Sequence, residues 1–170
     1  MSKMRFRDTG IWDDGWFANL PPDMKHAWTY LNDVCDNAGV WEVTPLSLKL
    51  ADAKIGGPCA DYHVDWEGFL KMAGHRVEVL ESGKWWSPRH IAFQCRGPLS
   101  FFGKKGPNRP HICIRELLRK HGLIERYAMI EIQLFGKTNL LEEDSAPKKP
   151  KSKSVGHQGD FALEDEPPAV

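Results

Sequence analysis

The sequence is poor in features that would place the chain in a membrane or cross-link it. It has no run of about 18 apolar residues, so no membrane-spanning helix is predicted. The first residues, MSKMRFRDTG, lack the apolar segment of a secretory signal, which favours an intracellular protein. The cysteines form no CxxC pair, so we expect reduced thiols rather than a redox or zinc motif. They are Cys35, Cys59, Cys95 and Cys113.

The chain also lacks net charge, because 23 Lys and Arg balance 23 Asp and Glu. The balance hides a strong asymmetry along the sequence. Residues 1–83 hold 8 basic against 13 acidic residues, residues 84–126 hold 10 against 2, and residues 127–170 hold 5 against 8. A basic segment inside a neutral chain indicates a surface for an anionic partner.

Three helices are predicted in the first half of the chain. In residues 21–39, apolar side chains recur at helical spacing, and Trp28 and Leu31 stand at the centre of the expected buried face. In residues 44–57, Thr44 and Pro45 are typical of a capped helix start. A third helix is expected from Asp61 to Met72. The short apolar segment VWEV, between the first two helices, predicts one strand.

A β-hairpin is predicted after the third helix. Val77 and Val79 share one face of its first strand, and Ser82-Gly83 supplies the turn. The return strand begins with Trp85-Trp86 and includes the segment RHIAFQC. Because neighbouring strand residues point to opposite faces, we expect one tryptophan to pack on the helices and the other to be partly exposed.

The remaining sequence predicts a loop, a fourth helix, a strand and a tail. Glycine and proline punctuate residues 96–110, and a helix is expected over 109–121 with Gly122 as its stop. The segment AMIEIQLFG predicts a further strand. Residues 141–170 are too polar to build a core and are expected to be disordered.

This order of elements predicts an α+β fold. A helix, a short strand, two more helices and a hairpin form the pattern of a winged helix-turn-helix, which has a three-helix core and a β-hairpin wing. Here it is followed by an additional C-terminal helix and a disordered tail. We therefore expect one domain in residues 1–140 and a charged tail in residues 141–170.

Three segments carry a resemblance to a known family. They are WFANLPPDMKHAWTYLNDVCDNAGVWEV, GKWWSPRHIAFQ and NRPHICIRELLRKHGL. In this order they resemble the N-terminal winged-helix domain of phage and prophage replisome-organiser proteins, over about residues 11–124. The resemblance implies binding of double-stranded DNA in replication initiation, recruitment of a host helicase or helicase loader, and a location in the cytoplasm of a bacterial host cell.

The third helix departs from ordinary DNA readout, because it carries Asp61, Asp65 and Glu67 against Lys71 alone. A helix in the major groove normally offers cationic or amide side chains. The basic residues of the wing, the loop and the last helix are therefore the predicted DNA-binding set. They are Lys84, Arg89, Lys104, Lys105, Arg109, His111, Arg115 and Arg119.

The sequence favours DNA binding over a metal site or an enzyme. Cys59 with His63, and His90 with Cys95, do not have the paired spacing of a structural zinc site, so no metal is predicted. The GKKGPN segment lacks the GxxxxGK[ST] frame of a phosphate loop, so no enzyme and no cofactor are predicted. The acidic third helix favours the alternative of an adaptor that docks another replication protein. The tail segment DFALEDEPP could be a short docking motif.

Overall fold

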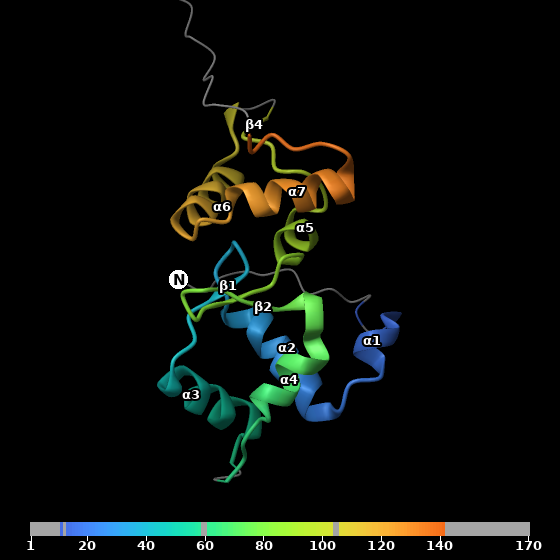
Figure 1. The fold of residues 1–170 in the computed structure, drawn as a ribbon, viewed down its shortest axis with the longest axis vertical. Coiled ribbons are helices and arrows are strands. Elements are labelled where there is room, and N and C mark those ends of the chain that lie inside the picture. The colour runs from blue at the N-terminus through green and yellow to red at the C-terminus, as the bar shows by residue number, and fades with distance from the viewer. Residues whose placement is uncertain (1–10, 12, 59–60, 104–105, 142–170) are drawn as a thin grey trace, which may run out of the picture.

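The structure is a computed structural model that describes residues 11, 13–58, 61–103 and 106–141 (Figure 1). The described part is a mixed α+β fold with seven α-helices and two small antiparallel sheets. The helices are α1 Gly15–Ala18, α2 Pro22–Val34, α3 Pro45–Gly56, α4 Trp66–Ala73, α5 His90–Cys95, α6 Arg109–Lys120 and α7 Ile124–Phe135. The strands are β1 Val40–Trp41, β2 Glu78–Val79, β3 Trp85–Trp86, β4 Phe102–Gly103 and β5 Gly106–Pro107. A short 3₁₀ turn, η2 Gly74–Arg76, follows α4.

The first two predicted helices are confirmed as α2 and α3. Pro22 occupies the first turn of α2, and Thr44 closes a capping box with Ser47 at the start of α3. On α2, Leu31 is fully buried as predicted, whereas Trp28 is only partly buried. Trp28 lies beside the buried face and meets the ring of Trp16 edge-on, at 5.1 Å between centroids.

The third helix begins later than predicted, at Trp66 instead of Asp61. The carboxylate of Asp65 accepts a hydrogen bond from the Gly68 N–H and caps α4. The preceding loop is held by the buried carboxylate of Asp52, which accepts bonds from the Val64 N–H at 3.1 Å and the Trp66 indole N–H at 3.0 Å. The local cap at Asp65 and the longer-range bonds of Asp52 together favour a loop over the extra helical turn.

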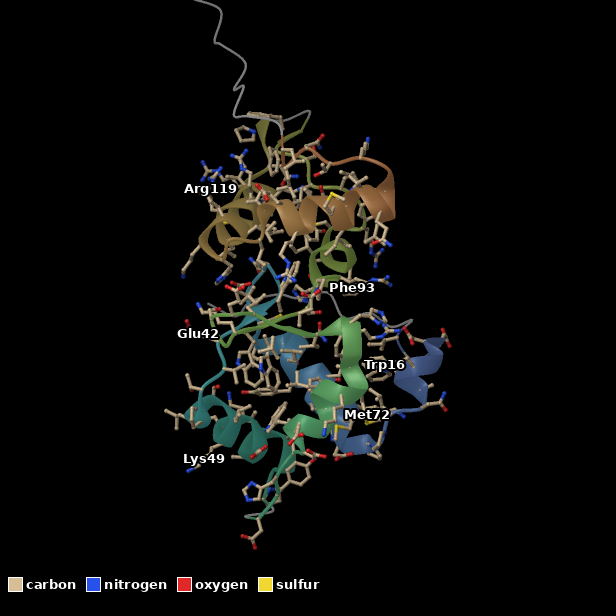
Figure 2. The ribbon with its side chains drawn as sticks, in the orientation of Figure 1. Trp16, Glu42, Lys49, Met72, Phe93 and Arg119 are labelled. Atoms are coloured by element: carbon tan, nitrogen blue, oxygen red, sulfur yellow. The ribbon has the colours of Figure 1, made fainter. Side chains whose placement is uncertain are left out.

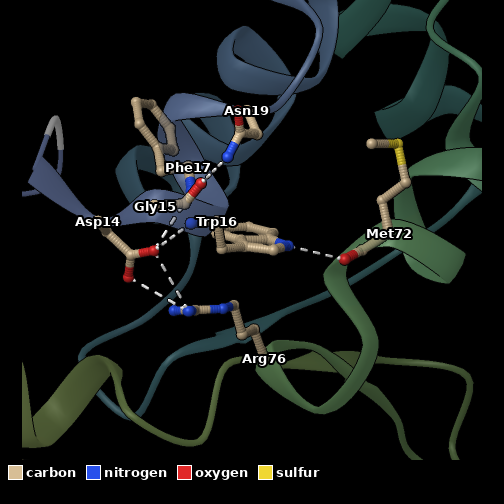
Figure 3. Close-up of polar contacts among 7 residues, drawn as sticks. All are labelled: Asp14, Gly15, Trp16, Phe17, Asn19, Met72 and Arg76. Atoms are coloured by element: carbon tan, nitrogen blue, oxygen red, sulfur yellow. Dashed lines mark hydrogen bonds and ion pairs between the residues drawn. The ribbon is translucent and has the colours of Figure 1, made fainter.

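A short helix, α1, is fastened to the end of α4 by the side chains drawn in Figure 3. The Asp14 carboxylate caps α1 and lies 3.2 Å from the Arg76 guanidinium, which stacks over the Trp16 ring at 4.3 Å. The Trp16 indole N–H donates to the Met72 carbonyl at 2.9 Å. Charge, stacking and a hydrogen bond thus fix α1 against α4 and η2.

The central sheet has the order β1-β3-β2 and confirms the predicted hairpin turn at Gly83, whose φ is 76°. Trp86 pairs with Val40 and Trp85 pairs with Trp41 across β1 and β3. The sheet lies between two helical layers, with α2–α4 on one side and α5–α7 on the other (Figure 1).

Both tryptophans of β3 are buried, so the prediction that one would be partly exposed is wrong. Trp85 packs with Trp41 in the cluster formed by α1–α4, and Trp86 packs with Val40 in the cluster formed by α5–α7. The two faces do differ, as strand geometry requires, but each face meets a core of its own. A sheet covered on both faces places apolar residues next to each other in sequence.

Two predicted strands are helices in the structure. The segment RHIAFQC forms α5, because the return strand ends at Trp86 and Pro88 cannot donate to a continuing ladder. The segment AMIEIQLFG belongs to α7, which ends at Gly136 with a left-handed φ of 73°. Short apolar runs do not by themselves distinguish strand from buried helix. Three helices therefore follow the hairpin in the described residues, where the sequence predicts one.

The predicted tail, 141–170, lies outside the described residues except for Leu141. Within the described ranges, the helices are too short or too polar to cross a bilayer.

Candidate nucleic-acid interface

Helix α6 carries most of the predicted DNA-binding residues that the structure describes. Its prediction over 109–121 is confirmed to within one residue, with Pro110 in the first turn and a left-handed Gly122 after the end. Ile114 and Leu118 anchor its inner face in the cluster that contains Trp86. The outer face of α6 is therefore fixed relative to the sheet.

His111, Arg115 and Arg119 of the predicted set lie four residues apart along α6, but they do not follow one exposed face. Four residues advance a helix by slightly more than one turn, so the line rotates as it proceeds along α6. His111 and Arg115 are partly buried, and Arg119 is exposed. Only the last member of the line is therefore open to a large anion.

His111 makes a neutral contact with the loop before α6. Its Nδ1 accepts a hydrogen bond from the Ser100 N–H at 2.9 Å, so that nitrogen carries no proton. Burial also lowers the pKa of His111. The residue therefore adds no positive charge at neutral pH and orients the loop instead.

Arg115 is a packing residue as much as a cation. Its guanidinium stacks over the Phe101 ring at 4.4 Å, and only 13% of its side chain is exposed. Phe101 is itself buried in the cluster of α5–α7. A cation held against an aromatic face in this way stabilises the loop and offers little surface to a phosphate.

The outer face of α6 holds the cations that a polyanion can reach. Arg109, Arg119 and Lys120 are all exposed (Figure 2 labels Arg119). Glu116 lies on the same face and binds the Arg119 guanidinium at 2.6 Å. Lys120 was missed by the sequence-based prediction, although it stands in the basic segment and lies eleven residues, about three turns, beyond Arg109.

The hairpin and the end of α6 come together around one carboxylate, Glu42. The Lys84 ammonium lies 2.9 Å from this carboxylate, and the bond to Lys84 is the main cause of the lowered pKa of Glu42. The charges of Lys120 and His121 lower that pKa further. His121 also binds Asp36 at 2.8 Å, which ties the α6–α7 turn to the turn before β1. The wing and the basic helix therefore share one edge of the molecule.

The other predicted residues lie in two places. Arg89 is exposed and directly precedes α5. Lys104 and Lys105, which fall between β4 and β5 in the sequence, lie outside the described residues.

The third helix, α4, lies away from this edge. Helix α4 is in the layer on the opposite side of the sheet from α6 (Figure 1). Its Glu67 binds Lys71 at 2.7 Å, and its Asp65 is used as the helix cap. The acids of α4 therefore do not face the cations of α6.

The histidines considered as metal ligands, His63 and His90, make structural contacts instead. His90 is buried against Cys35 and Asn32, and His63 lies 3.2 Å from Asp52, the carboxylate that orders the loop before α4. Among the described residues, no three His, Cys, Asp or Glu side chains are grouped to hold a metal ion.

What this surface can do chemically is bind an extended anion. Its cations are long and spread over a helix and a hairpin, exposed on α6 and paired with Glu42 at Lys84, an arrangement that suits a charged backbone better than a small ligand. No protein-family model, curated protein or solved structure matches the chain.

Proposed function

We propose that the protein binds duplex DNA without catalysing a reaction, through the edge formed by the wing and α6. The observation that carries the proposal is the joining of α6 to the sheet through His121 and Asp36, beside the Lys84–Glu42 pair of the hairpin. Helix α6 exposes Arg109, Arg119 and Lys120. Phosphate contacts of this kind supply sequence-independent affinity and orient a protein on the duplex.

The order of elements supports a winged-helix architecture for the part up to β3. A helix, strand, two helices and a hairpin build a sheet of order β1-β3-β2, in which the hairpin lies beside the first strand. The proposal also places the protein in phage or prophage replication, in the cytoplasm of a bacterial host, as the family resemblance implies. It differs from ordinary winged-helix binding because the single cation of α4, Lys71, is paired with Glu67, and because α5–α7 cover the far face of the sheet.

The strength of binding follows from the number of cations at this edge. Arg109, Arg119 and Lys120 of α6 and Lys84 of the hairpin can each neutralise a phosphate, although Lys84 and Arg119 must exchange Glu42 and Glu116 for DNA. Four phosphate contacts give a log–log salt slope of about −3 to −4. The affinity for any duplex should therefore fall steeply between low and physiological salt.

A salt titration with matched variants tests the proposal. The double variant Arg109→Ala/Lys120→Ala should weaken binding to all sequences alike and make the slope shallower by about 2. The control, Lys49→Ala/Lys54→Ala, removes the same charge from α3, which lies at the other end of the molecule (Figure 2 labels Lys49). No affinity at low salt, or an equal loss in the control, would refute the proposed surface.

A second candidate is the adaptor function, in which the protein docks a host helicase, a helicase loader or another replication protein. It is favoured by Leu46 and Leu50, one turn apart on α3, which are more than half exposed. Pull-down of such a purified factor, lost in Leu46→Ser/Leu50→Ser and retained in Arg109→Ala/Lys120→Ala, would support the adaptor. The reverse pattern would refute it.

A further inference from the structure

Helix α7 leaves an apolar stripe without cover. Its inner face buries Tyr127, Ala128 and Glu131, whereas Met129 is 65% exposed and Ile132 is 40% exposed. Exposed Glu125 precedes Met129 by four residues and Ile132 by seven, so the three side chains share one helix face. The stripe therefore begins with an acid and continues with two apolar residues.

The two ends of α7 offer opposite charges, since Arg126, next to Glu125, is paired with Glu78. Glu125 is in the first turn of α7, and exposed Lys137 follows the Gly136 cap at the other end. A second copy turned end for end would thus present a lysine to each glutamate. The face is complementary to itself, as a twofold interface requires.

The other exposed apolar pair in the described helices lacks this property. On α3, Leu46 and Leu50 are accompanied by exposed Lys49 and Lys54, and the acid of that helix, Asp52, is buried. A second copy placed there would bring lysines against lysines. The charges of α3 suit an acidic partner, whereas those of α7 suit another α7.

We infer that two copies of this chain associate through α7, antiparallel about a twofold axis, with Met129 and Ile132 at the centre and Glu125 of one copy against Lys137 of the other. Antiparallel packing also brings the negative end of each helix dipole beside the positive end of the other. The helix has 12 residues and is about 18 Å long, so the two α6–α7 turns and their cations are kept apart.

The interface is small, which sets how the association behaves. One helix face is less than the roughly 800 Å² per partner of a standard stable interface. The dimer should therefore form and dissociate with protein concentration. This inference is independent of the proposed DNA binding, and it is tested in the absence of nucleic acid.

Sedimentation velocity of the full chain over a range of concentrations tests the inference. The wild type should shift from the mass of one chain toward that of two, and Met129→Glu should weaken the association about tenfold or more by burying a charge. The matched control is Leu46→Glu, because Leu46 is 66% exposed on α3 and should leave association unchanged. A wild type that stays monomeric throughout, or a control that alone abolishes the dimer, would overturn the inference. Unchanged far-UV circular dichroism shows that each variant folds.

Charge reversal tests the antiparallel register. Glu125→Lys and Lys137→Glu should each weaken self-association, because each places like charges at both ends of the interface. A mixture of the two variants should associate at least as well as the wild type, since every contact then joins opposite charges. If both single variants dimerise normally and mixing changes nothing, this pairing is wrong.

Discussion

The two helical layers that enclose the sheet differ in the side chains that form their cores. The layer of α1–α4 is aromatic, and a chain of ring contacts with centroids 5.4–6.2 Å apart links Trp41, Trp66, Phe69 and Trp85. The layer of α5–α7 is mainly aliphatic around Trp86 and encloses a fully buried carboxylate, Glu131. The exposed cations of the proposed interface belong to this second layer.

This difference indicates that the first layer supplies rigidity, whereas the second layer carries the residues proposed to bind DNA. Interlocked aromatic rings bury large apolar areas and tolerate little movement. The second layer uses buried polar bonds to hold its loops, since the Glu131 carboxylate accepts from the Leu99 N–H at 2.7 Å and the Thr138 hydroxyl at 2.6 Å. Its integrity therefore depends on a few polar contacts that single substitutions can remove.

Truncating one tryptophan of β3 at a time should have the largest effect on stability, and it tests whether the two layers differ. Trp85→Ala and Trp86→Ala should each cost about 3–5 kcal/mol, because both side chains are buried. Urea unfolding followed by circular dichroism measures this loss. In Trp86→Ala, hydrogen exchange should show α6 and α7 losing protection before α2. Equal loss of protection in both layers would mean that they do not differ in local stability.

The buried carboxylate gives a smaller effect that depends on pH. Glu131→Leu should cost about 1–3 kcal/mol, because it leaves the buried Leu99 N–H without its acceptor. Burial raises the pKa of Glu131 above its ordinary value of 4.5, so the folded protein holds the proton more tightly than the unfolded chain.

The sign of the pH effect follows from this raised pKa. The stabilisation is fully present below the unfolded pKa and is lost as the pH rises through the folded pKa. Glu131→Gln imitates the protonated side chain, so its advantage over the wild type should grow from about pH 4.5 toward neutrality. Thermal melts across this range measure the difference. A constant difference would show that the carboxylate does not titrate with a raised pKa.

The smallest expected effect distinguishes two arginines on one helix. Arg115→Ala should lower stability by about 1 kcal/mol, because it removes the guanidinium stacked on Phe101. Arg119→Ala should change stability by less than about 0.5 kcal/mol, since its ion pair with Glu116 is exposed, but it should weaken DNA binding. Melts and DNA titrations of both variants provide the measurements. Similar stability losses would place both arginines in the same role.

The sequence predicts the first layer better than the second. Thr44 with Pro45, and Ser82 with Gly83, act through local geometry, so the start of α3 and the hairpin turn could be found from neighbouring residues alone. The boundary of α4 depends on Asp52, which is far enough along the chain that no local pattern announces it. The start of α4 is thus determined by contacts between residues that are distant in the sequence.

The second layer was harder to predict because its short apolar segments are compatible with either a strand or a helix. The residues of α5 and α7 alternate or cluster in ways that suit a strand, and only their packing on Trp86 selects helix. At the candidate site, the sequence locates the basic helix but not the rotation of its face. Phe101, which covers Arg115, comes from a loop whose position the sequence does not specify.

The placement of Trp85 and Trp86 on opposite faces has a consequence during synthesis of the chain. Every residue of the aromatic cluster has been made once Trp85 is added, whereas the cover of Trp86 needs α6 and α7, which end at Phe135. At roughly 5–20 residues per second, the ribosome takes on the order of seconds to add that cover. During this interval all residues of the first layer have been synthesised, but the indole of Trp86 still lacks the helices that cover it. The nascent chain is therefore most exposed to misassociation after its first half has already folded.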